Sequence, residues 1–428
     1  MITQEPQQPG QAPNKEVQWI SNPTGLFSGS NYSEPEGADG IDPYFLWADV
    51  NGFAHLRTRQ QERGSNGQIP EWIPILIKLA AEVHPADIQA ARANYLVIPP
   101  EYTDTSRKLQ GATVPGRVTR RFLEVLRNDR TLDQQIERFE MDLPQNALLA
   151  ESVEQPEKVH QREQSVQIAA RTTSNTLKSG PAPRVLGKKI IAIIDDGCPF
   201  AHRDFLTGSL SVLNTLDTRL ARLWDMNFSV GAGQPGPPPI SSMGREFTNV
   251  DLVSLIKKHI HNGILDEDGV YTEFAAGTIE NVNRLRRRAS HASGILHLAS
   301  GTRFAEDWMC TRTNAPAENP NWELLQDDAV EADIVFVQLP MRTVPLTTLR
   351  GTMQSDVLLG LQYILDVCPR DAEVTVNLSW GTLAGSHTGT NLLEAEIDRL
   401  VRLHWPRLQV VVPACNGYRT RTHANFQL

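Results

Sequence analysis

The stretch KKIIAIIDDGCPFAHRDF, residues 188–205, decides the fold. Its unbroken apolar run, rich in β-branched isoleucine, is typical of a strand that is buried on both faces of a sheet. Asp195, Asp196 and Gly197 follow where this strand would end, and the carboxyl ends of strands in open α/β sheets are where sites form. A carboxylate buried there needs a partner, such as an imidazole, a metal ion or a backbone cap. The local sequence alone also fits an Asp that caps the next turn, with Gly197 supplying a positive φ.

Strand-like and helix-like segments alternate through the second half of the chain. Strands are expected at 333–339, 374–379 and 408–414, and helices at 250–260, 291–301, 353–368 and 391–404. This alternation predicts an α/β fold, with a doubly wound, mostly parallel sheet covered by helices on both faces.

The first part of the chain has a different character. Residues 1–16 are rich in Gln and Pro and predict a disordered tail. Residues 17–149 hold enough aromatic and apolar residues for a folded α+β domain, in which the spacing predicts amphipathic helices over 69–91 and 119–141. Residues 150–187 are polar and end in Gly and Pro, which predicts a linker to a second domain at 188–428.

Composition is that of an ordinary soluble globular protein. Of 428 residues, 40% are hydrophobic and 21% charged, and the formal net charge is −9. Such a charge gives no general attraction to nucleic acid or to an anionic membrane, and no apolar run is long enough to span a bilayer. The N-terminus lacks the basic start and apolar core of a signal peptide. We therefore expect a cytoplasmic protein without a nucleic-acid or membrane partner.

No cofactor or metal is predicted. The four cysteines are widely spaced, without the pairing typical of zinc or redox sites. The acidic run Asp266 to Asp268 lacks the alternating oxygen-ligand spacing of a calcium loop and predicts a solvated turn.

Two more polar residues stand at the ends of apolar segments. His291 begins HASGILHLASG, and Asn416 follows the apolar run VVVPAC. Each alone has an ordinary explanation: His291 as a helix cap or core histidine, and Asn416 as a left-handed turn residue before Gly417.

Together these segments resemble the subtilisin-like serine protease family. IIDDG at 193–197, with the HRDF that follows it, resembles the family's Asp motif, and HASGILHLASG resembles its His motif. VTVNLSWG at 374–381 resembles the segment that lines the substrate groove. VVVPACNG at 410–417 resembles the oxyanion Asn segment. The chain departs from the family at Ala292, Ser293 and Cys415, where Gly, Thr and Gly are usual.

The resemblance implies a role for each residue. Asp195 would accept the Nδ1 proton of His291, which would act first as general base and then as general acid. Asn416 would donate a hydrogen bond to the oxyanion of the tetrahedral intermediate. The groove segment, Ser379, Trp380 and Gly381, would bind an extended polypeptide substrate as an added strand through its backbone.

One part of the family's pattern is missing. The Gly-Thr-Ser motif that supplies the nucleophile should come well after Asn416, but GYRTRTHANFQL, residues 417–428, contains no serine. We expect the chain to be a fragment, inactive by itself, of a serine endopeptidase whose sheet and catalytic serine continue past Leu428.

Two other functions stay open. A catalytically inactive relative would keep the groove and bind peptides. A nucleotide-binding α/β protein would place the Asp pair on a ribose or a metal, although no GxGxxG or Walker-type loop follows Asp195. The domain at 17–149 is compatible with a propeptide-like unit or with a recognition domain, and no motif in it decides between them.

Overall fold

The structure is a computed structural model that describes residues 72–92, 94–142, 185–226, 236–238, 244–274, 290–301, 328–339, 353–379 and 389–413, with some isolated positions. The predicted tail, most of the predicted linker, Trp380, Gly381 and Asn416 lie outside the described residues.

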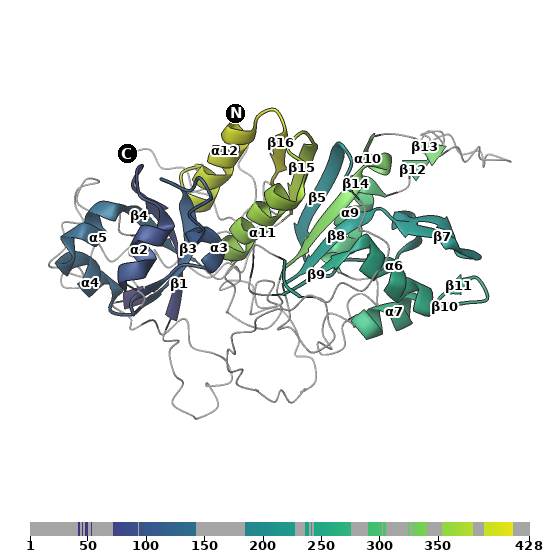
Figure 1. Cartoon of the computed structure of the whole chain (residues 1–428), viewed down its shortest axis with the longest axis horizontal. Coiled ribbons are helices and arrows are strands. Elements are labelled where there is room, and N and C mark those ends of the chain that lie inside the picture. Colours follow the sequence, from purple (N-terminus) through teal and green to yellow (C-terminus); the bar gives the residue numbers. More distant parts are fainter. Residues whose placement is uncertain are drawn as a thin grey trace, which may run out of the picture.

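A six-stranded sheet with the order β16-β15-β5-β14-β8-β9 forms the centre of the second half of the chain (Figure 1). All neighbouring strands in it are parallel except β8 and β9, which are antiparallel. The expectation of an α/β class with a mostly parallel sheet is therefore met. The strands are β5 (Lys189–Asp195), β8 (Leu220–Asp225), β9 (Arg245–Thr248), β14 (Asp333–Gln338), β15 (Glu373–Leu378) and β16 (Leu408–Val411).

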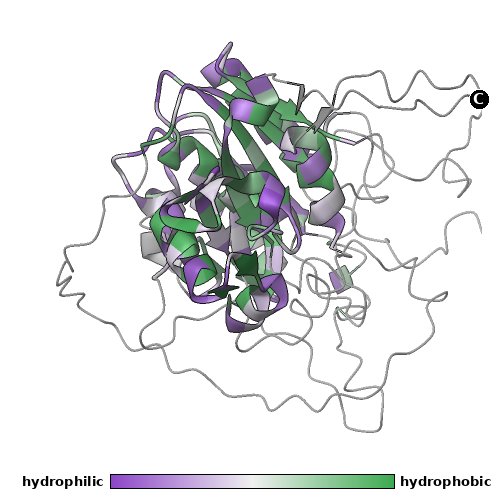
Figure 2. Ribbon diagram, turned by 90° about the vertical axis from the view of Figure 1, so that its right-hand side faces the viewer, coloured by the Kyte–Doolittle hydropathy of each residue, from purple (hydrophilic) through white to green (hydrophobic). Residues whose placement is uncertain are grey.

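Strand β5 lies inside this sheet and is buried on both faces, as its sequence indicates. Ile190, Ala192 and Ile194 point into one hydrophobic core, whereas Ile193 belongs to the core on the opposite face. The first core includes residues of α11 (Met353–Val367) and α12 (Leu392–His404). The second includes residues of α6 (Asn249–Lys258), α7 (Glu267–Phe274) and α9 (His291–Ser300). Hydrophobic residues are concentrated accordingly along the strands and the helix sides turned toward them (Figure 2).

Helix α11 crosses close above the sheet at Gly360. A Cβ atom there would lie 3.2 Å from Val337 Cγ1 and 3.3 Å from Ile194 Cδ1. The missing side chain lets the helix backbone approach the two inner strands, β14 and β5.

A second, antiparallel sheet with the order β2-β3-β1-β4 forms the N-terminal unit. Its strands are β1 (Trp72–Leu79), β2 (Leu96–Val97), β3 (Thr113–Thr119) and β4 (Ile136–Met141). Its helices are α2 (Pro85–Arg92), α3 (Pro100–Thr103), α4 (Phe122–Asn128) and α5 (Arg130–Gln135).

The helix predicted over 69–91 is wrong in its first half, where the structure has strand β1. Ile73, Ile75 and Ile77 alternate at the period of a strand and are fully buried. Pro74 is tolerated because the pairing of β1 with β4 begins only at Ile75. The helix predicted over 119–141 is likewise broken into α4, α5 and strand β4.

The N-terminal unit packs against α11 and α12, and one hydrophobic core runs through both (Figure 1). Two carboxylates from the end of β4 also bind the first turns of these helices. Glu140 accepts a hydrogen bond of 2.8 Å from the Leu392 amide. Asp142 accepts bonds of 3.2 and 3.0 Å from the amides of Gln354 and Ser355. Both helix N-termini are thus capped by residues that precede them by more than 200 positions.

Asp142 is 1% exposed, and burial raises the pKa of its carboxyl group to about 7, although hydrogen bonds from Ser355 and Gln354 oppose the shift. The nearby carboxylate of Asp356 adds to the rise in pKa. The folded protein therefore keeps a proton at Asp142 that the unfolded chain loses near pH 4.

Stability should consequently fall as the pH rises from the unfolded pKa of Asp142, near 4, to its folded pKa, about 7, by up to about 1.4 kcal/mol per pH unit from this group. The variant Asp142→Asn cannot titrate there, so its free energy of unfolding should depend less steeply on pH between about pH 5 and pH 7. Urea unfolding at several pH values measures both slopes.

Glu124→Gln is the matched control, because a hydrogen bond from Arg121 lowers the pKa of the Glu124 carboxyl group, out of this range. Parallel curves for wild type and Asp142→Asn would contradict the assigned pKa.

Candidate active site

Asp195 is the last residue of β5, and its side chain is fully buried. Its carbonyl oxygen accepts a hydrogen bond of 2.7 Å from the Leu339 amide, just past the end of the neighbouring strand β14. Its Oδ1 atom accepts a bond of 2.7 Å from the amide of Asp196. The bond from Leu339 therefore holds the backbone of Asp195, and the bond from Asp196 holds its carboxylate.

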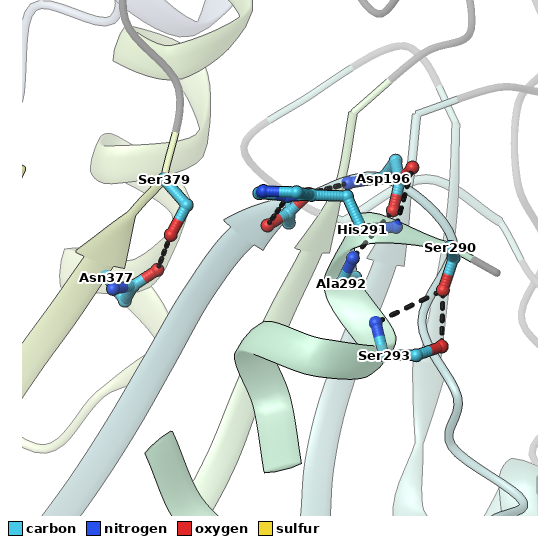
Figure 3. Close-up of polar contacts among 8 residues, drawn as sticks. Asp196, Ser290, His291, Ala292, Ser293, Asn377 and Ser379 are labelled. Carbon is cyan, nitrogen blue, oxygen red and sulfur yellow. Dashed lines mark hydrogen bonds and ion pairs between the residues drawn. The ribbon is translucent and has the colours of Figure 1, made fainter. Parts of the chain in front are cut away.

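His291 is the first residue of α9, and its ring lies against this carboxylate (Figure 3). Nδ1 of His291 is 2.9 Å from Oδ2 and 3.0 Å from Oδ1 of Asp195. Because an ionised carboxylate only accepts hydrogen bonds, Nδ1 carries the proton, and in the neutral ring Nε2 keeps a lone pair. The His291 side chain is 42% exposed, whereas that of Asp195 is fully buried, so solvent reaches the pair from the histidine side.

Asp196 caps the helix that carries His291. Its Oδ1 accepts a hydrogen bond of 2.9 Å from the Ala292 amide, and its Oδ2 one of 3.3 Å from the His291 amide. Ser290, the N-cap residue, accepts a bond of 3.1 Å from the Ser293 amide. Asp196 thus caps α9, which begins 95 residues later, and Asp195 faces the imidazole.

The pKa of His291 is raised above its ordinary value. The hydrogen bond with Asp195 is the largest cause, the charges of Asp195 and Asp196 contribute as well, and partial burial opposes the shift. The pair therefore stabilises the imidazolium form of His291.

Ser379 lies at the same edge of the sheet. Strand β15 runs parallel to β5 with Leu378 opposite Ile194, so the next residue, Ser379, is level with Asp195. Ser379 Oγ donates a hydrogen bond of 2.6 Å to Asn377 Oδ1 (Figure 3). The other residues expected in this groove, Trp380 and Gly381, and the expected oxyanion donor Asn416 lie outside the described residues.

A buried polar chain supports the site and was not foreseen from the sequence. Gln338 accepts a hydrogen bond of 2.9 Å from the Cys198 amide and donates one of 2.9 Å to Asp225. Arg245 Nη2 lies 3.0 Å from Asp225 Oδ2, and Gln338, Asp225 and Arg245 are all buried. Gln338 and Asp225 are the last residues of β14 and β8, as Asp195 is of β5. A polar residue at the end of an apolar strand is the sequence signal from which Gln338 and Asp225 could have been predicted.

A comparison of the chain with protein-family models, with curated proteins and with solved structures finds no match. None of the helices that the structure describes combines the length and apolar content that crossing a membrane requires.

Replacing Asp195 by Asn should lower the pKa of His291, because it removes the carboxylate that does most to stabilise the imidazolium, while partial burial continues to lower the pKa. NMR titration of the His291 ring protons measures this pKa. The Asp195–His291 pair should stabilise the folded protein most below the ordinary pKa of histidine. This stabilisation should be lost as the pH rises through the raised pKa of His291.

Glu273→Gln serves as the control, since Glu273 contacts the ring of a different histidine, His259, at 2.8 Å. An unchanged His291 titration in Asp195→Asn would mean that the two side chains do not interact in solution.

Replacing Asp196 by Ala should destabilise the protein by about 1 to 3 kcal/mol, since it leaves buried amides of α9 without their acceptor. Urea unfolding gives the value. Asp398→Ala, at a side chain 67% exposed on α12, should change stability by less than about 0.5 kcal/mol. Equal effects of the two substitutions would rule out the capping role.

Proposed function

We propose that the chain is the N-terminal and core part of a subtilisin-like serine endopeptidase that hydrolyses polypeptides through an Asp-His-Ser triad. One observation carries the proposal: a fully buried carboxylate, Asp195, at the carboxyl end of an inner parallel strand, with both oxygens near Nδ1 of a partly exposed imidazole, His291. This geometry suits a general base whose second nitrogen faces a nucleophile.

In the proposed reaction, Nε2 of His291 takes the proton of a serine hydroxyl while the serine Oγ attacks the peptide carbonyl carbon. Asp195 stabilises the imidazolium that forms, in keeping with the raised pKa of His291. The imidazolium then protonates the leaving amine as the C–N bond breaks. Water repeats the attack on the acyl-enzyme and restores the serine. The serine itself is proposed to come from residues that follow Leu428.

The division of work between the two aspartates supports this assignment. If Asp195 were only a turn or helix cap, its oxygens would be engaged mainly by backbone amides. Instead Asp196 binds the amides at the start of α9, and both carboxylate oxygens of Asp195 lie within 3.0 Å of Nδ1 of His291. The capping of α9 by Asp196 fixes the helix end that positions His291, and Asp195 fixes the ring.

The substrate groove is proposed to follow the end of β15. Ser379 is level with Asp195 there, and an extended peptide would pair with the backbone of Ser379, Trp380 and Gly381. Asn416 is proposed to donate to the oxyanion, which requires its side chain to reach the same edge of the sheet.

The docked N-terminal unit favours the propeptide-like alternative over a separate recognition domain. It shares one hydrophobic core with α11 and α12, and its Glu140 and Asp142 bind their first turns. A recognition module joined only by a linker would not be expected to complete the packing and the helix caps of its neighbour.

The test uses the whole open reading frame, expressed past the codon for Leu428, and an unfolded protein such as reduced casein as substrate. We expect hydrolysis by the wild type and a loss in kcat of about 10⁴-fold for Asp195→Asn and about 10⁶-fold for His291→Ala, with unfolding midpoints that show both variants fold. A serine-directed fluorophosphonate should label the wild type and not His291→Ala.

His259→Ala, on the surface pair with Glu273, is the control and should keep full activity. Full activity in His291→Ala would refute the proposal. Peptide binding without any hydrolysis by the wild type would replace it with the inactive, peptide-binding relative.

A further inference from the structure

Three side chains that commonly bind metal ions converge between the turn after β5 and helix α9. His202 and Asp204 belong to the HRDF turn after β5, where Arg203–Phe205 forms a short 3-10 helix. His297 lies on α9, six residues after His291. The cluster joins the same two segments of the chain that carry Asp195 and His291.

The spacing of the three ligand atoms suits one small ion. His297 Nε2 is 3.1 Å from His202 Nδ1 and 3.4 Å from Asp204 Oδ2, and the last two atoms are 3.9 Å apart. Ligands held about 2.0 to 2.1 Å from a tetrahedral zinc ion lie about 3.3 Å from one another. Only small shifts of the side chains would bring all three atoms to bonding distance of a common centre.

The hydrogen bonds of the two rings present two lone pairs to each other. His297 Nδ1 is 2.6 Å from the carbonyl oxygen of Ser293, which can only accept, so Nδ1 carries the proton and Nε2 of the neutral ring does not. Nδ1 of His202 accepts a bond of 3.3 Å from the amide of Asp204, so it also has a lone pair. His202 Nδ1 and His297 Nε2 lie 3.1 Å apart, and this close approach is favourable when a proton on one of the two nitrogens, or a metal ion between them, joins the rings.

The second partner of His297 is the kind found at metal sites. A ligating histidine usually donates its other N–H to a carbonyl or carboxylate oxygen, which fixes the ring and its tautomer. Ser293 provides this oxygen one turn earlier on α9. The side chains of His202, Asp204 and His297 are 28%, 31% and 32% exposed, so an ion could enter from solvent and keep a water molecule as its fourth ligand.

We propose that His202, Asp204 and His297 form a binding site for a divalent transition-metal ion, with zinc as its expected occupant. Two imidazoles and one carboxylate favour such ions over calcium and magnesium, which take oxygen ligands. The bound ion fastens α9 to the turn after β5 at a second point, besides the contact between Asp195 and His291. It thereby fixes the orientation of the helix that carries His291, and the site does not depend on the peptidase proposal.

The test is zinc binding by the purified protein after removal of metal by a chelator, followed by calorimetric titration with zinc. We expect the wild type to bind one zinc ion per chain at this cluster, and we expect zinc to raise its unfolding temperature. In His297→Asn and Asp204→Asn this site should bind more than about 100-fold more weakly, since loss of even an outer partner of a metal site costs 10- to 100-fold.

His261→Asn, at an exposed histidine on the strand β10 (Ile260–His261), is the matched control and should bind as the wild type does. Thermal unfolding without metal shows whether each variant is folded. The same zinc stoichiometry and affinity in wild type and His297→Asn would overturn the proposal. The proposal would also be overturned if the wild type bound no zinc and its melting temperature fell as the histidines lost their protons. A proton, and not a metal ion, would then hold the two rings together.

Discussion

The burial of the Asp195 carboxylate is the constraint on which the rest of this structure depends. A charge taken fully out of water at the end of an inner strand is tolerated only if hydrogen-bond donors surround it. Among these donors are the amide of Asp196 and the ring of His291. Helix α9 must therefore begin directly above the end of β5, which places Ala292 and Leu296 in the core beneath it.

The same demand explains the polar chain at the neighbouring strand ends. Gln338, Asp225 and Arg245 are buried where β14, β8 and β9 meet, and each satisfies the next. The Arg245 guanidinium also lies 5.0 Å from the ring centre of Phe247 and 5.2 Å from that of Phe274, which lowers the cost of burying its charge. Such a network favours one arrangement of the strand ends over any slipped alternative, because a shift would leave several buried groups unpaired.

The sequence was most informative where one physical demand dominated. The apolar run before Asp195 and the alternation of strands and helices after residue 289 each follow from one demand, the burial of apolar side chains, and the described elements agree with both. The stretch WIPILIKL, residues 72–79, was ambiguous, because its apolar residues fit a helical spacing as well as an alternating one. The three isoleucines at every second position were the better indicator of a strand.

Contacts between distant segments were beyond what the sequence could predict. Nothing in the sequence around Asp142 indicates that it binds α11, since its partners follow more than 200 residues later. The contact between His202 and His297 could not be predicted for the same reason, because the two residues are 95 positions apart in the sequence. Only the packing of α9 on the sheet brings the two rings within 3.1 Å.

A common arrangement links these separate findings. The helices α9, α11 and α12 each begin with amides that need acceptors, and in each case a carboxylate from another part of the chain provides one: Asp196, Asp142 and Glu140. Two of the three come from the N-terminal unit. Removing that unit would therefore expose the shared core and leave the first turns of α11 and α12 without these acceptors. The N-terminal unit thus completes both the hydrophobic packing and the first turns of α11 and α12, the two helices that flank β15 in the sequence.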